Sequence, residues 1–154
     1  MDLDVEALKA KLSALRTEHR DLDDVIAMCG ACLKAPSVRQ AVISEQFWRE
    51  VPFVLSRNGD VDPDRCPLVS GRVDMVYRDG DELVVIDYKT DKEVTKDSAE
   101  QYALKHHAGQ AEVYAQALAA ATGLSVREVA FVYCKAGAEV RLRERSVVGV
   151  AAVG

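Results

Sequence analysis

The chain has 154 residues, of which 49% are apolar and 29% charged, and its formal net charge is −5. This length suits a single domain with a full hydrophobic core. No apolar run is long enough to span a membrane and the first residues lack a signal-peptide pattern, so we expect a cytoplasmic protein with no membrane partner. The negative charge argues against an autonomous DNA-binding module, because DNA affinity depends largely on cationic side chains.

The first 45 residues are predicted to be helical. Apolar residues at helical spacing indicate an amphipathic helix over residues 3–16. We expect its apolar side to pack on the chain's own core, and a neighbouring domain of a longer parent is the alternative. A second helix is predicted over residues 22–33, with Asp21 as its N-cap and Pro36 after its end, and a short helical segment follows over residues 38–43.

Two of the four cysteines, Cys29 and Cys32, form a C-x-x-C pair near the end of the second helix. A redox or metal-binding role would require both thiols to be exposed and to have further ligands. The other two, Cys66 and Cys134, do not complete a metal-binding spacing that we can identify. We therefore interpret the cysteines as structural thiols, and we expect no disulfide framework in a cytoplasmic protein of this size.

The middle of the chain is predicted to form strands. Alternating apolar and polar residues indicate a strand over residues 47–56, followed by a turn at 57–60 and a loop over 61–67. A β-hairpin is predicted from two apolar runs, 68–78 and 83–90, that flank Gly80 and Asp81.

Three charged residues interrupt this apolar hairpin. If Gly80 and Asp81 form a two-residue turn, cross-strand partners have residue numbers that add up to 161, so Asp74 and Asp87 lie opposite each other. Their Cβ atoms would then be about 4.5–5.5 Å apart. Lys89 follows Asp87 by two residues and therefore projects from the same face of the strand.

Two carboxylates this close repel each other unless a cation lies between them. Ligands that are all oxygen favour Mg²⁺ or Mn²⁺. Lys89 would then orient a water molecule or stabilise negative charge on a phosphate oxygen. The alternative is a structural salt bridge between Lys89 and the aspartates. The apolar flanking residues favour the metal site, because burying three charges for stability alone is unfavourable.

The last third of the chain is predicted to contain a long helix and a second hairpin. A polar loop over residues 91–98 leads into a helix over 99–121, which ends before Gly123. A hairpin follows from residues 126–134 and 138–143. The tail, 147–154, is expected to be an edge strand or a frayed end.

One stripe of the long helix is more polar than packing requires. Gln110, Tyr114 and Leu118 are four residues apart, so they lie on one side of the helix and can face the sheet. His106 and His107 lie one turn earlier. We interpret them as surface residues, and contact with a phosphate is the less favoured alternative.

Four motifs in this order resemble a known family. They are R-E-x-P-F (Arg49 to Phe53), G-x-x-D (Gly71 to Asp74), D-Y-K-T-D (Asp87 to Asp91) and Q-x-x-x-Y (Gln110 to Tyr114). Together they resemble the PD-(D/E)xK nuclease superfamily, and within it the RecB/AddA-like nuclease domains of helicase–nucleases of the exodeoxyribonuclease V type. The resemblance runs from about residue 45 to residue 120.

The resemblance implies an α/β fold, with a restriction-endonuclease-like mixed β-sheet flanked by helices. Residues 1–45 would be a helical N-terminal part and 46–143 the nuclease core of one domain, as a fragment of a larger helicase–nuclease. It implies two partners, DNA and a helicase that is either a further domain or a separate subunit. It also implies exonucleolytic hydrolysis of phosphodiester bonds in DNA repair and recombination.

The resemblance also implies roles for individual residues. Asp74, Asp87 and the carbonyl of Tyr88 would bind Mg²⁺ or Mn²⁺, and Lys89 would be the catalytic lysine. Gln110 and Tyr114 would lie beside the site and hold the DNA backbone or the site's geometry.

One feature of the family has no counterpart in this sequence. Many RecB-like domains have a further metal-binding histidine on an upstream helix, after a glycine, and His19 lacks that context. A catalytically incomplete module that scaffolds a helicase or guides DNA is therefore the alternative function.

Overall fold

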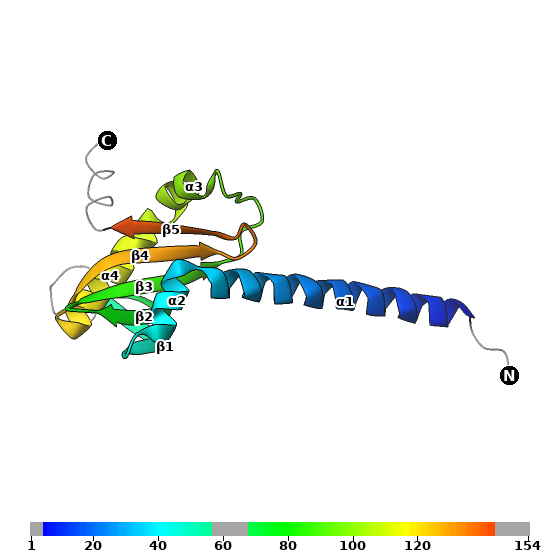
Figure 1. Cartoon of the computed structure of the whole chain (residues 1–154), viewed down its shortest axis with the longest axis horizontal. Helices are drawn as coiled ribbons and strands as arrows, with labels where there is room; N and C mark the ends of the chain where they lie inside the picture. Colours follow the sequence, from blue (N-terminus) through cyan, green and yellow to red (C-terminus); the bar gives the residue numbers. More distant parts are fainter. Residues whose placement is uncertain (1–4, 57–67, 144–154) are drawn as a thin grey trace.

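A five-stranded mixed sheet forms the centre of the protein (Figure 1). The computed structural model describes residues 5–56 and 68–143. The strands are β1 (Phe47–Ser56), β2 (Leu68–Asp79), β3 (Glu82–Lys89), β4 (Ser125–Tyr133) and β5 (Ala138–Arg143), and the helices are α1 (Val5–Lys34), α2 (Pro36–Ile43), α3 (Ala99–His106) and α4 (Ala108–Thr122). The expected α/β class with a mixed sheet and flanking helices is confirmed. The turn at 57–60, the loop at 61–67 with Cys66, and the tail at 147–154 lie outside the described residues.

The strand order is β1-β2-β3-β4-β5, so β3 is the central strand. β1, β2 and β3 pair antiparallel, β3 and β4 pair parallel, and β4 and β5 pair antiparallel. The predicted hairpin register is confirmed. The cross-strand pairs run from Asp79 with Glu82 to Met75 with Ile86. Gly80, in the turn that joins the two strands, has a φ of 65°, which glycine adopts without a steric cost. Asp74 and Asp87 come one step after the last of these pairs.

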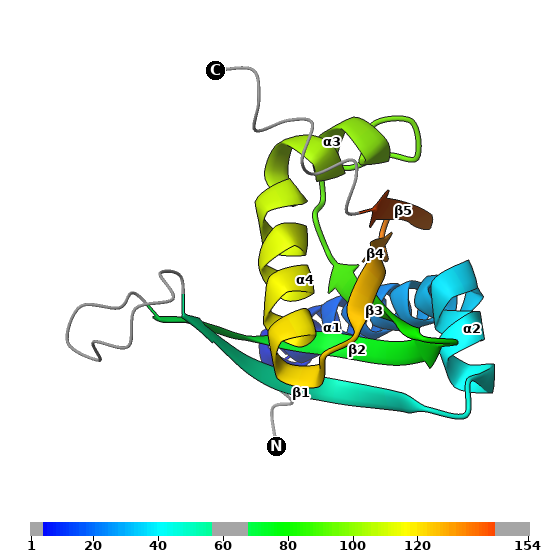
Figure 2. The same cartoon turned by 90° about the vertical axis from the view of Figure 1, so that its left-hand side faces the viewer.

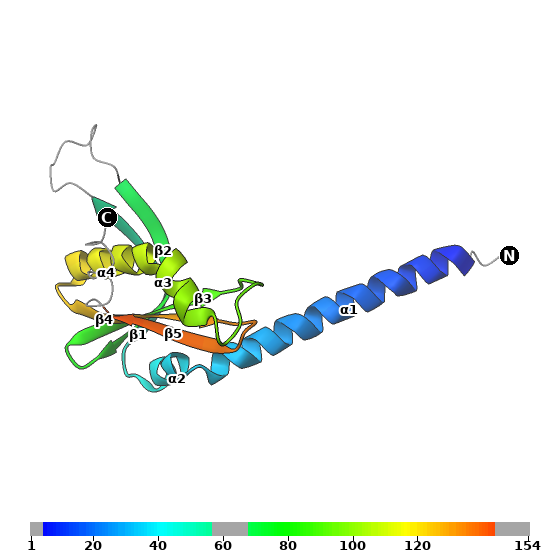
Figure 3. The ribbon, with the colours of Figure 1, turned by 90° about the horizontal axis from the view of Figure 1, so that it is seen from above.

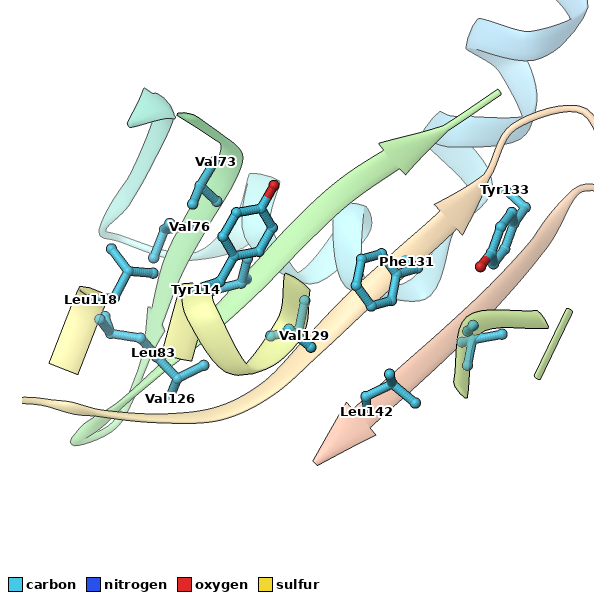
Figure 4. Packing of buried hydrophobic residues seen from close by; sticks show 14 of the residues in the cluster. Val73, Val76, Leu83, Tyr114, Leu118, Val126, Val129, Phe131, Tyr133 and Leu142 are labelled. Atoms are coloured by element: carbon cyan, nitrogen blue, oxygen red, sulfur yellow. The ribbon is translucent and has the colours of Figure 1, made fainter. Parts of the chain in front are cut away.

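Helices cover both faces of the sheet (Figure 2). α3 and α4 pack on one face, where their alanines and Leu118 meet β3 and β4 side chains such as Val85 and Phe131 (Figure 4). α2 packs on the other face against a second cluster that contains Val84 and Ile86. Successive β3 residues thus enter different cores, as the two-residue period of a strand requires. Residues 83–87 of β3 are buried, and all of them are apolar except Asp87.

The N-terminal helix differs from the prediction. Residues 5–34 form one continuous helix, α1, instead of two helices, because the polar segment between the predicted helices contains no glycine or proline to end it. The expected packing of its apolar side on the chain's own core is wrong. None of its residues is buried, and most of α1 projects away from the sheet (Figures 1 and 3). No helix in the described part of the chain is long and apolar enough to cross a membrane.

The long helix predicted over residues 99–121 is interrupted. It breaks at His107, whose backbone leaves helical geometry (φ −122°, ψ −2°), so α3 and α4 are separate. The expectation that His107 is a surface residue is also wrong. Its ring stacks on Phe131 at 5.2 Å between centroids, and only 15% of its side chain is exposed. Burying this aromatic ring against β4 accompanies the change in helix direction. His106 is exposed, as expected.

The two-sided core makes a prediction about stability. Ile86 is fully buried on β3, whereas Ile43 at the end of α2 is 82% exposed. Ile86→Ala should lower the free energy of unfolding by about 2–5 kcal/mol, because it leaves a cavity in a packed core. Ile43→Ala, the same change on the surface, should alter it by less than about 0.5 kcal/mol. Urea unfolding followed by circular dichroism measures both, and equal effects would contradict the assignment of the core.

The environment of His107 makes a prediction about pH. Burial, and then the nearby charge of Lys89, lower the pKa of His107 below its ordinary value. The unfolded chain therefore binds this proton more readily than the folded one, and stability should fall as the pH drops below about 6.5. His107→Phe keeps an aromatic ring and should lose less stability than the wild type between pH 7 and 5. His106→Phe, the exposed neighbour, should follow the wild type in urea unfolding at each pH.

Candidate active site

The two aspartates meet at the end of the β2–β3 hairpin. Asp74 does not continue the backbone ladder. Its carboxylate bonds to β3 instead of its backbone, since Oδ2 accepts a hydrogen bond of 2.8 Å from the backbone N–H of Tyr88. Burial is the largest cause that raises the pKa of Asp74, and the negative charge of Asp87 raises it further. The two carboxylates therefore lie near enough to repel each other, as the register predicts.

Asp87 and three other side chains form a closed ring. Lys89 Nζ lies 2.7 Å from Asp87 Oδ2 and donates a hydrogen bond of 2.7 Å to Gln110 Oε1. Gln110 Nε2 donates to the Tyr114 hydroxyl at 2.7 Å, and that hydroxyl donates to Asp87 Oδ1 at 2.9 Å. Lys89, Gln110 and Tyr114 thus each donate to the next group, and the Asp87 carboxylate accepts from Tyr114 and pairs with Lys89. The structure brings together the residues predicted from two separate motifs, one on β3 and one on α4.

Burial gives this ring its rigidity. Asp87 is only 4% exposed, and a charge in such a place is costly unless it is paired. Tyr114 is also buried, and burial together with the charge of Asp87 raises the pKa of its hydroxyl. The hydroxyl consequently stays protonated and remains a donor to Asp87. Gln110 has one orientation that satisfies both neighbours, because the ammonium can only donate.

The R-E-x-P-F and G-x-x-D motifs support the Tyr114 ring through Phe53 and Gly71. The Phe53 ring on β1 meets the Tyr114 ring edge to face, with 5.6 Å between centroids and 82° between planes. Gly71 on β2 lies beneath Phe53, and a Cβ there would come within 2.8 Å of the ring. Gly71 is therefore required by the close approach of an aromatic ring. Through Phe53, β1 and β2 help to fix the position of α4.

The structure adds neighbours that the sequence did not indicate. His107 Nε2 lies 3.9 Å from Asp91 Oδ2, and the Tyr102 hydroxyl donates to Asp91 Oδ1 at 3.1 Å. The charges of Lys89 and Asp87 both act on His107, so it borders the ring. Asp91 is the last residue of the D-Y-K-T-D motif, and this position could have indicated that it lies near the site. The closeness of His107 depends on the break between α3 and α4, which the helical pattern did not predict.

The donor set fits a hard divalent cation. Asp87 Oδ2 is buried and has no hydrogen-bond donor within the described residues, although Lys89 is close to it as an ion pair. Asp74 Oδ2 is already bound by Tyr88, which leaves its second oxygen outside that bond. Carboxylate and carbonyl oxygens are the ligands that Mg²⁺ and Mn²⁺ prefer. Within residues 5–56 and 68–143, no three His, Cys, Asp or Glu side chains group in a way that could hold a metal.

The remaining candidates do not join this site. His19 is on α1, largely exposed, and lies 3.3 Å from Asp23. Cys29, Cys32 and Cys134 are free thiols. Burial and the neighbouring Cys134 raise the pKa of Cys32 to about 12, so it is a poor nucleophile. These observations agree with structural thiols rather than a redox pair.

Comparison with known proteins supports this assignment of the fold. The model of the PD-(D/E)XK nuclease superfamily matches residues 6–150. An ATP-dependent helicase/nuclease subunit from Geobacillus thermodenitrificans is 33% identical over 123 residues, which cover 71% of this chain and 10% of that protein. The protein of the same name from Carboxydothermus hydrogenoformans is 28% identical over 153 residues, covering 92% of this chain and 13% of that protein.

The chain thus spans about a tenth of the length of the curated relatives it matches. A solved structure, that of SSO0001, superposes with a TM-score of 0.44 and 19% identity, covering 89% of this chain and 66% of the other. The family model covers the sheet, α4 and the hairpin carboxylates alike. This chain belongs to the PD-(D/E)XK nuclease superfamily.

Proposed function

We propose that this chain is the nuclease domain of an ATP-dependent helicase–nuclease, and that it hydrolyses phosphodiester bonds of DNA with Mg²⁺ or Mn²⁺. The observation that carries the proposal is the closed ring of Asp87, Lys89, Gln110 and Tyr114 beside Asp74. A purely structural ion pair would not need a glutamine and a tyrosine to orient both of its members. Membership of a nuclease superfamily and the names of the relatives support the same reaction class.

In this proposal Asp74, Asp87 and the Tyr88 carbonyl would hold the metal. When bound there, a divalent ion supplies Lewis-acid activation of water and neutralises charge on the phosphate. Tyr114 holds Asp87 by its Oδ1 atom, which keeps the carboxylate plane fixed. Asp74 is held in the same way by the Tyr88 N–H. Both carboxylates are therefore positioned before any ligand arrives.

Lys89 would act on the scissile phosphate. Gln110 and Asp87 hold its ammonium group at 2.7 Å each, and its side chain is only 15% exposed. A positioned cation in a site that excludes water stabilises negative charge on a phosphate oxygen as that charge develops, or orients the attacking water. We extend the proposal to DNA repair in the cytoplasm, exonuclease activity and attachment to a helicase, which the names of the helicase/nuclease relatives support.

One observation favours a second candidate. The described residues hold no third metal-binding side chain beside Asp74 and Asp87. A domain of this kind would keep the nuclease fold and the ring but would guide DNA or scaffold a helicase without cutting. Binding of Mn²⁺ to the carboxylates distinguishes the two, since a competent site binds the ion and an incomplete one does not.

The proposed roles make separable predictions for Asp87 and Lys89. Asp87→Asn should abolish both Mn²⁺ binding and Mg²⁺-dependent cleavage, since it removes a ligand charge. Lys89→Met should reduce cleavage on the order of 10²-fold or more while Mn²⁺ still binds. Calorimetry with Mn²⁺ and a nuclease assay on labelled DNA measure the two properties. Asp81→Asn, at the fully exposed turn of the same hairpin, is the control and should change neither. Full cleavage by Lys89→Met would overturn the mechanism.

Tyr114 should act by positioning Asp87. Tyr114→Phe keeps the ring in the core and removes only the hydroxyl that donates to Asp87. We expect Mn²⁺ affinity to fall by about 10–100-fold, the usual effect of losing a partner that orients a metal ligand. Tyr77→Phe is the matched control, because its buried hydroxyl bonds Gln40 on the opposite side of the sheet. The affinity of the Tyr77→Phe variant for Mn²⁺, measured by calorimetry, should equal that of the wild type.

A further inference from the structure

The apolar side of α1 follows a regular heptad. Its members alternate in steps of three and four residues, which keeps them on one narrow stripe of the helix. The stripe consists of Val5, Leu8, Leu12, Leu15, His19, Leu22, Ile26, Cys29 and Leu33. Seven of these nine residues are large and apolar. Val5 is the first a position and Leu8 the first d position, so Leu8, Leu15 and Leu22 occupy consecutive d positions. The pattern is that of a coiled-coil seam and is narrower than the face of a helix that packs on a sheet.

The body of the protein leaves this seam open. All of its large apolar members are exposed. The exposed fraction is lowest for Leu12, at 49%, and highest for Ile26, at 67%. Where α1 meets the body, Cys32, a g position directly beside the seam, packs against the cluster that contains Val84 and Ile86. The rest of α1 extends away from the sheet (Figures 1 and 3). The whole stripe spans about 42 Å at 1.5 Å per residue, and an apolar surface of this kind marks an interaction site.

Charges beside the seam disfavour a parallel pair of identical helices. In a parallel coiled coil, each g position lies next to the following e position of the partner. Here that places Lys11 against Arg16, and Glu18 against Asp23. Both contacts are between like charges and occur twice in a dimer. A parallel homodimer would therefore be repelled along the centre of its seam.

The same charges favour an antiparallel pair. Antiparallel helices bring e positions next to e positions and pair each a residue with a d residue of the partner. When seam residues whose numbers add up to 41 lie opposite each other, the stripe from Leu8 to Leu33 is covered completely by its copy. This arrangement places Arg16 against Asp23 of the second copy, twice. Every other e and g contact has at least one uncharged side chain.

Shifting the antiparallel pair by one heptad loses this match. A shift in one direction places Arg16 against Arg16 and Glu18 against Glu18, and a shift in the other places Asp23 against Asp23. The first shift covers eight of the nine seam positions, as many as the unshifted pair, and the second covers six. The unshifted pair is thus one of two alignments with the greatest apolar overlap, and of these two it alone has no like-charge contact. The charges therefore select the register between two alignments of equal apolar overlap.

From this exposed seam and its charge pattern we propose that α1 is a self-association helix, which pairs with α1 of a second copy in an antiparallel coiled coil. Leu15 then packs on Ile26 of the other copy, and Leu12 on Cys29. The two nuclease bodies lie at opposite ends of the coiled coil. The seam is on α1 and uses no residue of the ring around Asp87.

Sedimentation equilibrium of the full chain tests the association. We expect a dimer that dissociates on dilution, and a monomer at every attainable concentration would overturn the proposal and leave the seam to another protein. Leu15→Glu should abolish the dimer. Ala14→Glu adds the same charge at an exposed c position, on the side of the helix away from the seam, and should keep the dimer. Circular dichroism at matched concentrations shows whether each variant stays folded.

A charge exchange tests the direction of the helices. In the antiparallel pair, Arg16→Asp places two aspartates together and should raise the dimer Kd by roughly tenfold, about 1.4 kcal/mol. In a parallel pair it would instead face Lys11 and tighten the dimer. The double variant Arg16→Asp/Asp23→Arg should restore wild-type affinity. Tightening by the single variant, or failure of the double variant to restore affinity, would overturn the antiparallel register.

Thiol crosslinking tests the register directly. In a background where the other cysteines are serine, Cys29 lies about 25 Å from its own copy, since 17 residues separate it from its partner Leu12 at 1.5 Å each. A short bismaleimide should therefore leave this protein uncrosslinked. Adding Leu12→Cys should give a covalent dimer. Crosslinking through Cys29 alone would indicate a parallel pair and contradict the proposal.

Discussion

The structure depends on one buried carboxylate. Asp87 lies on the central strand, covered by helices, where an unpaired charge would cost far more than the fold could tolerate. Its two oxygens are met from different directions, by Lys89 two residues further along β3 and by Tyr114 from α4. Because Tyr114 must reach Asp87, pairing this charge fixes how α4 is rotated about its axis and where it lies along β3. The same contacts hold the carboxylate in place for a ligand.

The requirements of the ring explain several residues that carry no charge. Gln110 is one helical turn before Tyr114 and can reach both Tyr114 and Lys89, which an apolar residue could not. Phe53 supports the Tyr114 ring, and Gly71 is a glycine because Phe53 leaves no room for a Cβ. Four segments far apart in the chain thus serve one arrangement. Their order in the sequence reflects the order in which strands and helix pass the site.

The molecule has two parts with different physical demands. The body buries its apolar residues on both sides of the sheet. α1 has a seam that the body does not use, because the helix leaves α2 pointing away from the sheet (Figure 3). An apolar pattern shows that a surface will be covered and does not show by what. The charges next to the seam supply that information, since they permit some partners and repel others.

The sequence alone determined whatever depends on local pattern. Strand alternation, the Gly80–Asp81 turn and the register that brings Asp74 toward Asp87 follow from the two-residue period of a strand. The Gln110–Tyr114 stripe follows from the period of a helix, and motif order indicated which residues would meet. Three features were decided only by the tertiary structure: the break at His107, the approach of that histidine to Asp91, and the direction of α1. Each depends on contacts between residues distant in sequence, about which local periodicity contains no information.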